Sequence, residues 1–401
     1  MRMRHVLALC AVVMLAALPA RSSADIEDFI RSAEAGDVSA QKEVGFAYVR
    51  GTVVLQDYAK AADWFRMAAD AGDAEAQNQL ARMYASGLGL GKDPSAAAHW
   101  FGQAAQQGEP AFVYDYAAFL EAEGQPGTDE KVAALYGQAA AAGHAPSAIS
   151  LGVLFQTGRG VPEDFARAKE LYEVGIEAGL PRAFNNLGLL YARGHGVQQD
   201  YPRAAELFAT AADAGLTEAM RNLGVLYENG FGVDLDVERA AALYRMSGME
   251  RTKPIAEAAF VYDPRLSSVP QDPDALDALQ ASAEAGDPVA MFQVGWLLAA
   301  QPSAPFENLA QARLYFERAA RSGHGPSMVN LSLMYFQGRG APQDYVLGHK
   351  WLLMSKRAGT RAPALDKLSE SKMTAEQINT AQALALEQVR STVDANMTLN
   401  D

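Results

Sequence analysis

The sequence contains one cysteine, Cys10, and it lies close to the N-terminus. A chain with a single cysteine forms no internal disulfide and offers no cysteine pair for a zinc site. None of the six histidines stands in a His-x-x-x-His or His-x-x-Glu spacing, which would place two metal ligands on one helix face. We therefore expect no metal and no cofactor, and a fold that is held together by a large hydrophobic core.

Positive charge is also scarce. The chain has 34 lysines and arginines against 48 aspartates and glutamates, which gives a formal net charge of −14. A surface of this sign repels nucleic acid and anionic lipid, so we expect neither as a partner. A protein or peptide with a basic patch is the better match. Beyond the N-terminal segment, no run of about 18 apolar residues indicates a membrane span.

Residues 1–24 have the pattern of a secretory signal peptide. Two arginines precede the largely apolar run Val6–Leu18, and small residues follow up to Ala24. The run is too short to span a bilayer, and the small residues are typical of a cleavage site. We expect cleavage after Ala24, which removes Cys10 and leaves a net charge of −17. The prediction is a protein exported through a signal peptide to the periplasm of a bacterium, or secreted.

The stretch Gly-Leu-Gly-Leu-Gly-Lys at residues 87–92 resembles a loop that binds phosphate. A P-loop requires a glycine five residues before the glycine of its Gly-Lys pair, and a serine or threonine directly after that pair. Here Ser86 and Asp93 stand at those positions, and a carboxylate next to a phosphate would repel it. We therefore expect no phosphate site, and the recurrence of the stretch identifies it as a repeat turn.

The Gly-x-Gly pattern that ends in an aspartate returns four times, with steps of 71, 36, 36 and 108 residues between the first glycines. The period is thus 36 residues, and a weaker copy runs from Gly51 to Asp57. The first glycine of each copy is expected to end a helix in the left-handed conformation, and the aspartate to cap the next helix. We assign a structural turn or cap role to Gly87, Gly89, Asp93, Gly158, Gly160, Asp164, Gly194, Gly196, Asp200, Gly230, Gly232, Asp236, Gly338, Gly340 and Asp344.

A second series of glycines runs parallel to the first, and two helical patterns separate its members. In one pattern Ala183, Leu187 and Tyr191 form an apolar stripe, and in the next Ala204 and Phe208 do the same. Each unit is therefore predicted to be a helix hairpin. The units are bounded by Gly36, Gly72, Gly108, Gly143, Gly179, Gly215 and about Gly248, and then by Gly286, Gly323 and Gly359.

Residues 187–204, Leu-Gly-Leu-Leu-Tyr-Ala-Arg-Gly-His-Gly-Val-Gln-Gln-Asp-Tyr-Pro-Arg-Ala, resemble the signature of the Sel1-like repeat (SLR) family. The resemblance recurs in register along nearly all of the chain after the signal peptide. It implies an all-α fold, an α/α solenoid with a right-handed superhelix that is related to the tetratricopeptide repeats. We expect about eight 36-residue helix-hairpin repeats. The units that begin at Gly108 and Gly286 lack the Gly-x-Gly turn and are the weakest copies.

Prolines interrupt the repeat between Met249 and Gln271, which predicts either a long loop between two solenoid blocks or a locally remodelled helix. The sequence Ser-Ala-Glu-Ala-Gly-Asp of residues 32–37 returns at 282–287, and this repeated opening predicts that a second block begins near Asp274. The predicted domains are the signal peptide 1–24, a first block with an N-terminal cap and six repeats at 25–248, a proline-rich break or linker at 249–273, a second block of two repeats at 274–359, and a C-terminal helical cap or tail at 360–401.

Three asparagines, Asn186, Asn222 and Asn330, each precede a leucine of a first helix, with spacings of 36 and 108 residues. First helices line the concave surface in the family that the chain resembles, so these amides are candidates for binding an extended partner peptide. The alternative is that they tie the backbone of one repeat to the next. We favour this alternative, because buried amides usually satisfy neighbouring backbone groups.

The sequence predicts no catalytic residue. Ser39 and Ser369 stand in Ser-x-x-Lys patterns typical of penicillin-recognising enzymes, but no Ser-Asp-Asn or Lys-Thr-Gly completes such a site. We therefore expect a scaffold that mediates protein–protein interaction in the cell envelope, with its partner on the concave face, rather than an enzyme. The alternatives are a protein that binds or hydrolyses β-lactams or cell-wall peptides, and a structural brace that self-associates. The sequence predicts no particular oligomeric state.

Overall fold

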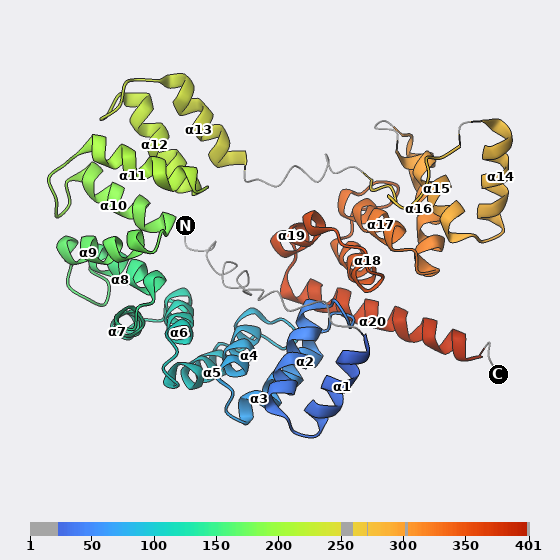
Figure 1. The fold of residues 1–401 in the computed structure, drawn as a ribbon, viewed down its shortest axis with the longest axis horizontal. Coiled ribbons are helices and arrows are strands. Elements are labelled where there is room, and N and C mark those ends of the chain that lie inside the picture. The colour runs from blue at the N-terminus through green and yellow to red at the C-terminus, as the bar shows by residue number, and fades with distance from the viewer. Residues whose placement is uncertain (1–22, 250–259, 271, 301–303, 399–401) are drawn as a thin grey trace. The chain divides into compact units, whose positions relative to one another are not determined.

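The computed structural model describes residues 23–249, 260–270, 272–300 and 304–398. Every regular element among these residues is an α-helix, and none of them forms a strand (Figure 1). The predicted all-α fold of helix hairpins is confirmed. All but the last two residues of the predicted signal peptide lie outside the described residues. None of the helices described is both long and apolar enough to cross a membrane.

The helices pair as hairpins, and each repeat has a first and a second helix. The first helices are α2 (Val38–Arg50), α4 (Ala74–Ser86), α6 (Pro110–Glu123), α8 (Ala145–Thr157), α10 (Pro181–Arg193), α12 (Thr217–Asn229), α15 (Pro288–Ala299) and α17 (Gly325–Gln337). The second helices are α3 (Tyr58–Asp70), α5 (Pro94–Gln106), α7 (Asp129–Ala141), α9 (Phe165–Glu177), α11 (Tyr201–Asp213), α13 (Val237–Met249), α16 (Phe306–Arg321) and α18 (Tyr345–Arg357). Outside these hairpins lie α1 (Ser23–Glu34), α14 (Pro273–Glu284), α19 (Pro363–Lys372) and α20 (Ala375–Thr398).

Packing divides the described residues into two compact units. Unit 1 holds residues 72–85 and 93–249, with the helices α4 to α13. Unit 2 holds residues 23–71, residues 86–92 and the described residues from 260 onward, with α1 to α3 and α14 to α20. Unit 2 therefore combines parts from both ends of the sequence.

The turn between the two helices of a repeat has a defined geometry, which the turn after α10 illustrates. Gly194 ends α10 with a φ of 70°, and Gly196 follows with a φ of 67°, both in the left-handed region. A Cβ on Gly196 would lie 2.5 Å from the Cβ of Phe165, because the turn packs on the start of α9. Asp200 then caps α11, since its carboxylate accepts a hydrogen bond from the N–H of Arg203 at 2.8 Å.

This geometry recurs at the other positions to which the sequence assigned a turn or cap role. Both glycines of each of the five Gly-x-Gly turns have a positive φ. Each aspartate accepts a hydrogen bond, at 2.8 or 2.9 Å, from the backbone N–H three residues further on. The five aspartates are Asp93, Asp164, Asp200, Asp236 and Asp344.

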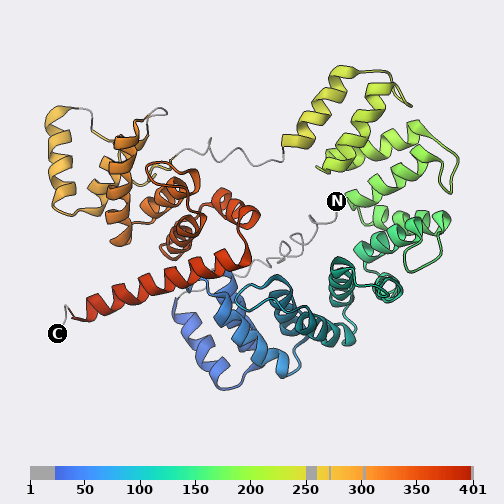
Figure 2. The same ribbon diagram turned by 180° about the vertical axis from the view of Figure 1, so that it is seen from behind.

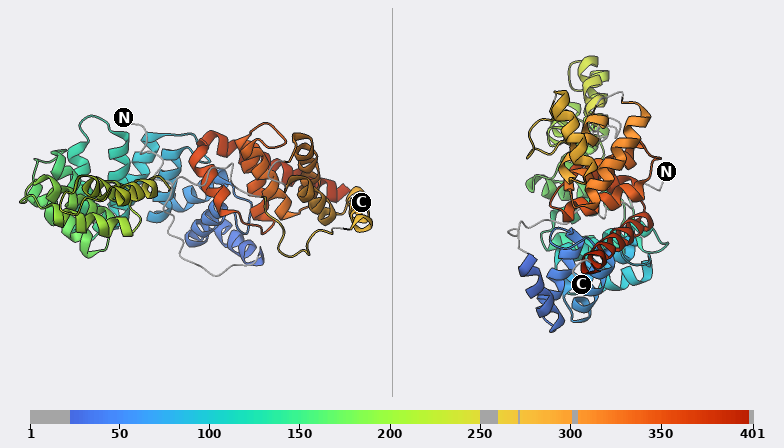
Figure 3. Two further views of the ribbon diagram at one scale, coloured as in Figure 1. Left: turned by 90° about the horizontal axis from the view of Figure 1, so that it is seen from above. Right: turned by 90° about the vertical axis from the view of Figure 1, so that its right-hand side faces the viewer.

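The core of unit 1 follows the second helices. Phe101, Tyr136, Tyr172 and Phe208 lie at the same register position of four successive second helices, and each is at most 1% exposed. Burial of a side chain of this size stabilises the fold by about 2 to 3 kcal/mol. Four successive hairpins of unit 1 thus each contribute one large ring to the core, and Figure 3 shows the hairpins of the chain from two further sides.

In unit 2, α17 is covered more completely than the other first helices. Its residues from Gly325 to Met334 are all buried. On one side, a Cβ on Gly325 would lie 2.1 Å from the hydroxyl oxygen of Thr360. α17 packs against α16 and α18, and the long α20 packs along α18 (Figure 2).

The glycine-rich stretch that resembles a phosphate loop contacts α20 within unit 2. The side-chain amide of Asn379 donates to the carbonyl oxygen of Gly87 and accepts from the N–H of Gly89, both at 2.9 Å. Next to it, the N–H of Tyr58 donates to Oε1 of Gln382 at 3.1 Å. The N–H of Gly89, which a phosphate loop would direct at an anion, therefore pairs here with a side chain of a helix.

Candidate functional site

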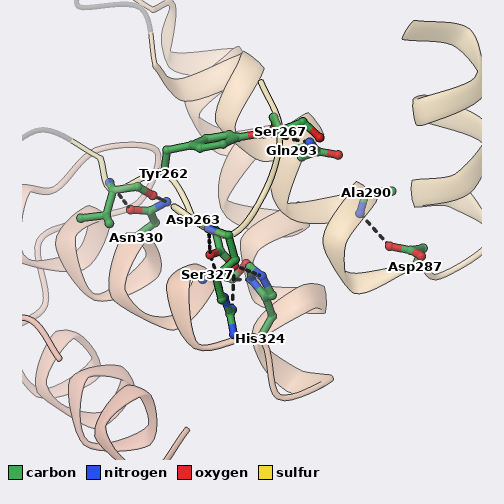
Figure 4. A network of polar contacts seen from close by, with 11 residues as sticks. Tyr262, Asp263, Ser267, Asp287, Ala290, Gln293, His324, Ser327 and Asn330 are labelled. Carbon is green, nitrogen blue, oxygen red and sulfur yellow. Dashed lines mark hydrogen bonds and ion pairs between the residues drawn. The ribbon is translucent and has the colours of Figure 1, made fainter. Parts of the chain in front are cut away.

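Residues 260–268, called here the docked segment, lie against α15 and α17 in unit 2 (Figure 4). The segment contains no helix. Phe260, Tyr262 and Leu266 pack against the core of unit 2, and Asp263 is 1% exposed. The side chain of Val261 lies on the other side of the segment, where the residue is 43% exposed. The segment therefore presents one face to the two first helices and the other to solvent.

Asn330 holds the main chain of this segment. Its Oδ1 accepts a hydrogen bond from the N–H of Val261 at 2.7 Å, and its Nδ2 donates to the carbonyl oxygen of Val261 at 2.9 Å. Asn330 is completely buried, and the segment supplies hydrogen-bond partners for both of its polar atoms. A neighbouring β-strand would satisfy a main chain in the same way, and the contact does not depend on the side chain of the residue that is held.

Tyr262 is fixed by both its ring and its hydroxyl group. The ring lies 5.6 Å from the ring of Phe292 and 5.1 Å from that of Trp296, in an edge contact with the latter. The hydroxyl accepts a hydrogen bond from Nε2 of Gln293 at 3.0 Å and donates to the carbonyl oxygen of Ser267 at 2.6 Å. The hydroxyl group of Tyr262 therefore makes two hydrogen bonds that a phenylalanine at this position would lack.

Phe260 is the apolar anchor of the segment. Its ring is buried and lies 6.1 Å from the ring of Phe316 on α16. The guanidinium group of Arg339 lies over the ring of Phe260 at 4.7 Å, which is a cation–π contact.

Asp263 carries a buried negative charge. Arg265 donates to its carboxylate from the backbone N–H at 3.0 Å, from Nε at 2.9 Å and from Nη2 at 2.7 Å. These hydrogen bonds lower the pKa of Asp263 to about 2, against the opposing effect of burial. The carboxylate is therefore ionised at neutral pH, and Nε2 of His324 lies 3.4 Å from it.

His324 connects the segment to the start of α17. Its Nδ1 caps the helix, 2.8 Å from the hydroxyl oxygen of Ser327 and 3.3 Å from the N–H of the same residue. Since Nδ1 accepts the backbone N–H, the ring proton lies on Nε2, which faces Asp263. Burial lowers the pKa of His324, with the charge of Asp263 acting in the opposite direction.

The other two predicted asparagines lie in unit 1, on α10 and α12. Asn186 and Asn222 are both half-exposed. Nδ2 of Asn222 donates to Oδ1 of Asn185 at 2.8 Å, and Nδ2 of Asn185 donates to Oδ1 of Asn186 at 3.3 Å. A chain of amides thus joins two neighbouring first helices. Asn185 was not predicted from the sequence. The one signal for it was its position directly before Asn186.

The two serines in Ser-x-x-Lys patterns lie in different surroundings. Ser369 is buried, and its hydroxyl donates to the carbonyl oxygen of Asp366 at 2.8 Å. Ser39 is exposed in the first turn of α2. Within the described ranges, no group of three histidine, cysteine, aspartate or glutamate side chains is arranged to hold a metal ion.

The sequence profile of the Sel1 repeat matches the chain at residues 38–73, 74–109, 145–180, 181–216, 217–250, 288–324 and 325–360. Together these stretches make up more than half of the chain. The chain belongs to the Sel1 repeat family. Of the two units expected to be weak, the one that begins at Gly286 is matched. The unit that begins at Gly108 is not matched, yet α6 and α7 form a hairpin there.

The chain is similar to two solved structures with Sel1 or SLR repeats and to one further protein. A Sel1 repeat protein from Oxalobacter formigenes has a structure that covers 57% of this chain and all of its own, with 28% identity and a TM-score of 0.50. A protective antigen of uropathogenic Escherichia coli with an SLR fold covers 90% of this chain and 86% of its own, with 25% identity and a TM-score of 0.33. The secretory immunoglobulin A-binding protein EsiB of Escherichia coli O6:H1 is 37% identical over 60 residues, which are 15% of this chain and 12% of EsiB.

In the register of the Sel1 repeats, Asn330 belongs to a longer row than the three predicted asparagines. The equivalent residue of every first helix is polar, and Gln293, which binds Tyr262, is one of them. Its signal in the sequence was its position directly before the apolar pair Val294–Gly295. The row, called here the first-helix row, consists of Glu43, Gln79, Asp115, Ser150, Asn186, Asn222, Gln293 and Asn330.

Proposed function

We propose that this chain is an exported scaffold that binds a partner protein through the first-helix row of its Sel1 repeats. Sel1 repeat proteins mediate protein–protein interaction. The observation that carries the proposal is the contact of Asn330 with both main-chain groups of Val261. This contact supports the proposal, because it pairs a residue of the row with the main chain of an extended segment, as in peptide recognition by main-chain pairing.

Unit 1 presents the same row positions in a half-exposed form. Asn186 and Asn222 lie on neighbouring first helices, so both can contact one extended segment that crosses the two helices. An amide group offers two donor hydrogens and an acceptor oxygen, and the bonds through Asn185 use only part of that capacity. We place the partner on this face of unit 1, which is the concave face of the solenoid in the proposal.

The sequence supports a location for this chain and a charge for its partner. The pattern of residues 1–24 supports export to the cell envelope of a bacterium. The net charge of −17 after cleavage favours a partner with a basic patch. The similarity to EsiB, which binds secretory immunoglobulin A, supports a protein rather than a small molecule as the ligand.

Capture of the partner tests the proposal. The mature chain and the double variant Asn186→Ala/Asn222→Ala are crosslinked to an envelope extract, and the captured proteins are identified by mass spectrometry. The matched control is Gln103→Ala/Gln138→Ala, which removes two exposed amides from second helices. We expect one protein to be captured by the wild type and the control and to be lost from the double variant, with an unchanged circular dichroism spectrum. Equal capture by all three proteins would contradict a role for the row.

A further inference from the structure

The docked segment has the contacts of a bound ligand although it belongs to the same chain. Its inward side chains alternate with an exposed one, since Phe260 and Tyr262 are held and Val261 between them points outward. The main chain at Val261 is paired as in an added strand. Alternating side chains and a paired main chain are features of extended peptides in binding sites.

The side chains that receive the segment are features of the repeat. The contact between His324 and the serine three residues later recurs before α8, where Nδ1 of His144 lies 2.8 Å from the hydroxyl oxygen of Ser147. His144 and Ser147 belong to unit 1, whereas the docked segment belongs to unit 2. The histidine–serine contact of the receiving site is therefore a feature of the repeat, which also forms where no docked segment belongs to the same unit.

The segment is also shaped by itself. Arg265 neutralises Asp263 two residues before it, and the hydroxyl of Tyr262 binds the carbonyl oxygen of Ser267. These bonds lie within the segment and close residues 262–267 into a turn without the help of the helices. A ligand that is pre-organised in this way loses less conformational entropy on binding.

We propose that the docked segment is a built-in ligand, and that the site around Asn330 binds, in its place, an extended segment of a partner protein with the pattern Phe-x-Tyr-Asp-x-Arg-Leu. The proposal rests on the proposed function in one respect only, namely that the chain binds proteins. It concerns unit 2 and not the asparagines of unit 1. The pattern lists the residues of the docked segment that contact the helices, together with the arginine that pairs with the aspartate.

Competition between the two ligands is governed by the tether. A segment tethered to its own site has an effective concentration in the millimolar range. A free peptide is therefore expected to bind the wild-type chain poorly, and to bind well once the built-in segment has lost its anchors. This expectation separates a ligand from a structural part of the core, which no free peptide replaces.

The first test measures binding of a fluorescent peptide with the sequence of residues 260–268 to the full chain. The variant Phe260→Ala/Tyr262→Ala removes the two aromatic anchors of the built-in segment. We expect the peptide to bind this variant about 10-fold or more tighter than the wild type, and a peptide with alanine in place of the tyrosine to bind at least about 10-fold more weakly. Absence of peptide binding to the variant, with a helical circular dichroism spectrum retained, would overturn the proposal.

A second test needs no variant and therefore does not depend on the folding of one. Hydrogen exchange of the Val261 amide is followed in the wild-type chain with and without about 5 mM of the unlabelled peptide, above the effective concentration of the tethered segment. Displacement of the segment should accelerate exchange at Val261 and leave the amide of Leu331 on α17 unchanged. Exchange at Val261 that does not respond to the peptide would contradict the proposal.

The two proposals fail in different ways. If capture is lost in Asn186→Ala/Asn222→Ala, and the peptide neither binds in the first test nor accelerates exchange in the second, only the proposal of a built-in ligand is wrong. Peptide binding in unit 2, together with capture that does not depend on the two asparagines, would remove only the role of the row in unit 1.

Discussion

The site around His144 in unit 1 and the site around His324 in unit 2 are built alike but are covered differently. In each site Nδ1 of the histidine lies 2.8 Å from the hydroxyl oxygen of the serine three residues later, and each ring lies near an aromatic residue of the preceding first helix, 5.0 Å from Tyr114 and 4.8 Å from Phe292. His144 is half-exposed, whereas His324 is buried under the docked segment. The repeat therefore supplies the receiving site, and an extended segment completes it.

The charges around the two rings differ accordingly. Burial lowers the pKa of both histidines. The opposing negative charge comes from Asp115 and Glu109 of the same unit at His144, but from Asp263 of the docked segment at His324. An acidic residue at this position of an incoming segment is thus favoured at the site in unit 2, whereas the site in unit 1 already has carboxylates of its own.

The largest expected effect is on the aromatic residue of each site. Phe292→Ala should lower the free energy of unfolding of unit 2 by about 3 to 5 kcal/mol, because Phe292 is fully buried against Tyr262 and Phe316. Tyr114→Ala should cost unit 1 only about 1 to 2 kcal/mol, because Tyr114 is half-buried. Urea unfolding followed by circular dichroism measures both. Equal losses would mean that coverage by the segment does not distinguish the sites.

Acid should destabilise unit 2 through a second buried histidine. Burial lowers the pKa of His349 to about 4, and neither of its ring nitrogens has a hydrogen-bond partner. The unfolded chain takes up the proton first, so stability that is present at neutral pH is lost as the pH falls from about 6.5 to about 4, by up to about 3 kcal/mol. His349→Leu should flatten the dependence of the urea midpoint on pH in this range. A slope as steep as that of the wild type would contradict the assignment.

Replacement of the row amides should have a smaller effect that again differs between the units. Asn330→Ala leaves the N–H and carbonyl groups of Val261 without the fully buried side chain that pairs with them and should cost about 1 to 3 kcal/mol. Asn222→Ala breaks one bond in a half-exposed setting and should cost about 1 kcal/mol or less. Thermal unfolding of the two single variants gives the comparison. A cost for Asn222→Ala as large as that for Asn330→Ala would remove the distinction.

The smallest effect should be the same in both units. Asp200→Ala in unit 1 and Asp344→Ala in unit 2 each remove one helix cap and should cost about 1 kcal/mol, whereas Asn at either position should retain most of the stability. Chemical denaturation of the four variants measures these differences. Unequal costs would show that the repeat turn has a further role in one of the units.

The hairpins were predictable because their turns depend on local geometry. A left-handed glycine and a capping aspartate are needed wherever a first helix passes into a second one, so both recur with the repeat. The hairpin of α6 and α7 shows how far this reasoning extends. It lacks the Gly-x-Gly turn, but Gly124 ends α6 with a φ of 60°, and the apolar residues still recur at helical spacing.

The docked segment could not be predicted in this way, because its contacts are distant in sequence. The prolines between 249 and 273 indicate a break, and nothing near Val261 indicates that its partner is Asn330, 69 residues later. The sequence left two interpretations of the predicted asparagines, partner binding and a tie to neighbouring backbone, and the contact of Asn330 has features of both. The buried amide of Asn330 satisfies backbone groups, and those groups belong to an extended segment rather than to the next repeat.

The central claim is that a residue of the first-helix row holds the main chain of an extended segment. The most direct measurement is hydrogen exchange at the amide of Val261 in the wild-type chain and in Asn330→Ala, with the amide of Leu331 on α17 as the internal reference. The account predicts exchange at Val261 that is faster in the variant by about 10-fold or more, with little change at Leu331. Equal protection of Val261 in the two proteins would contradict it.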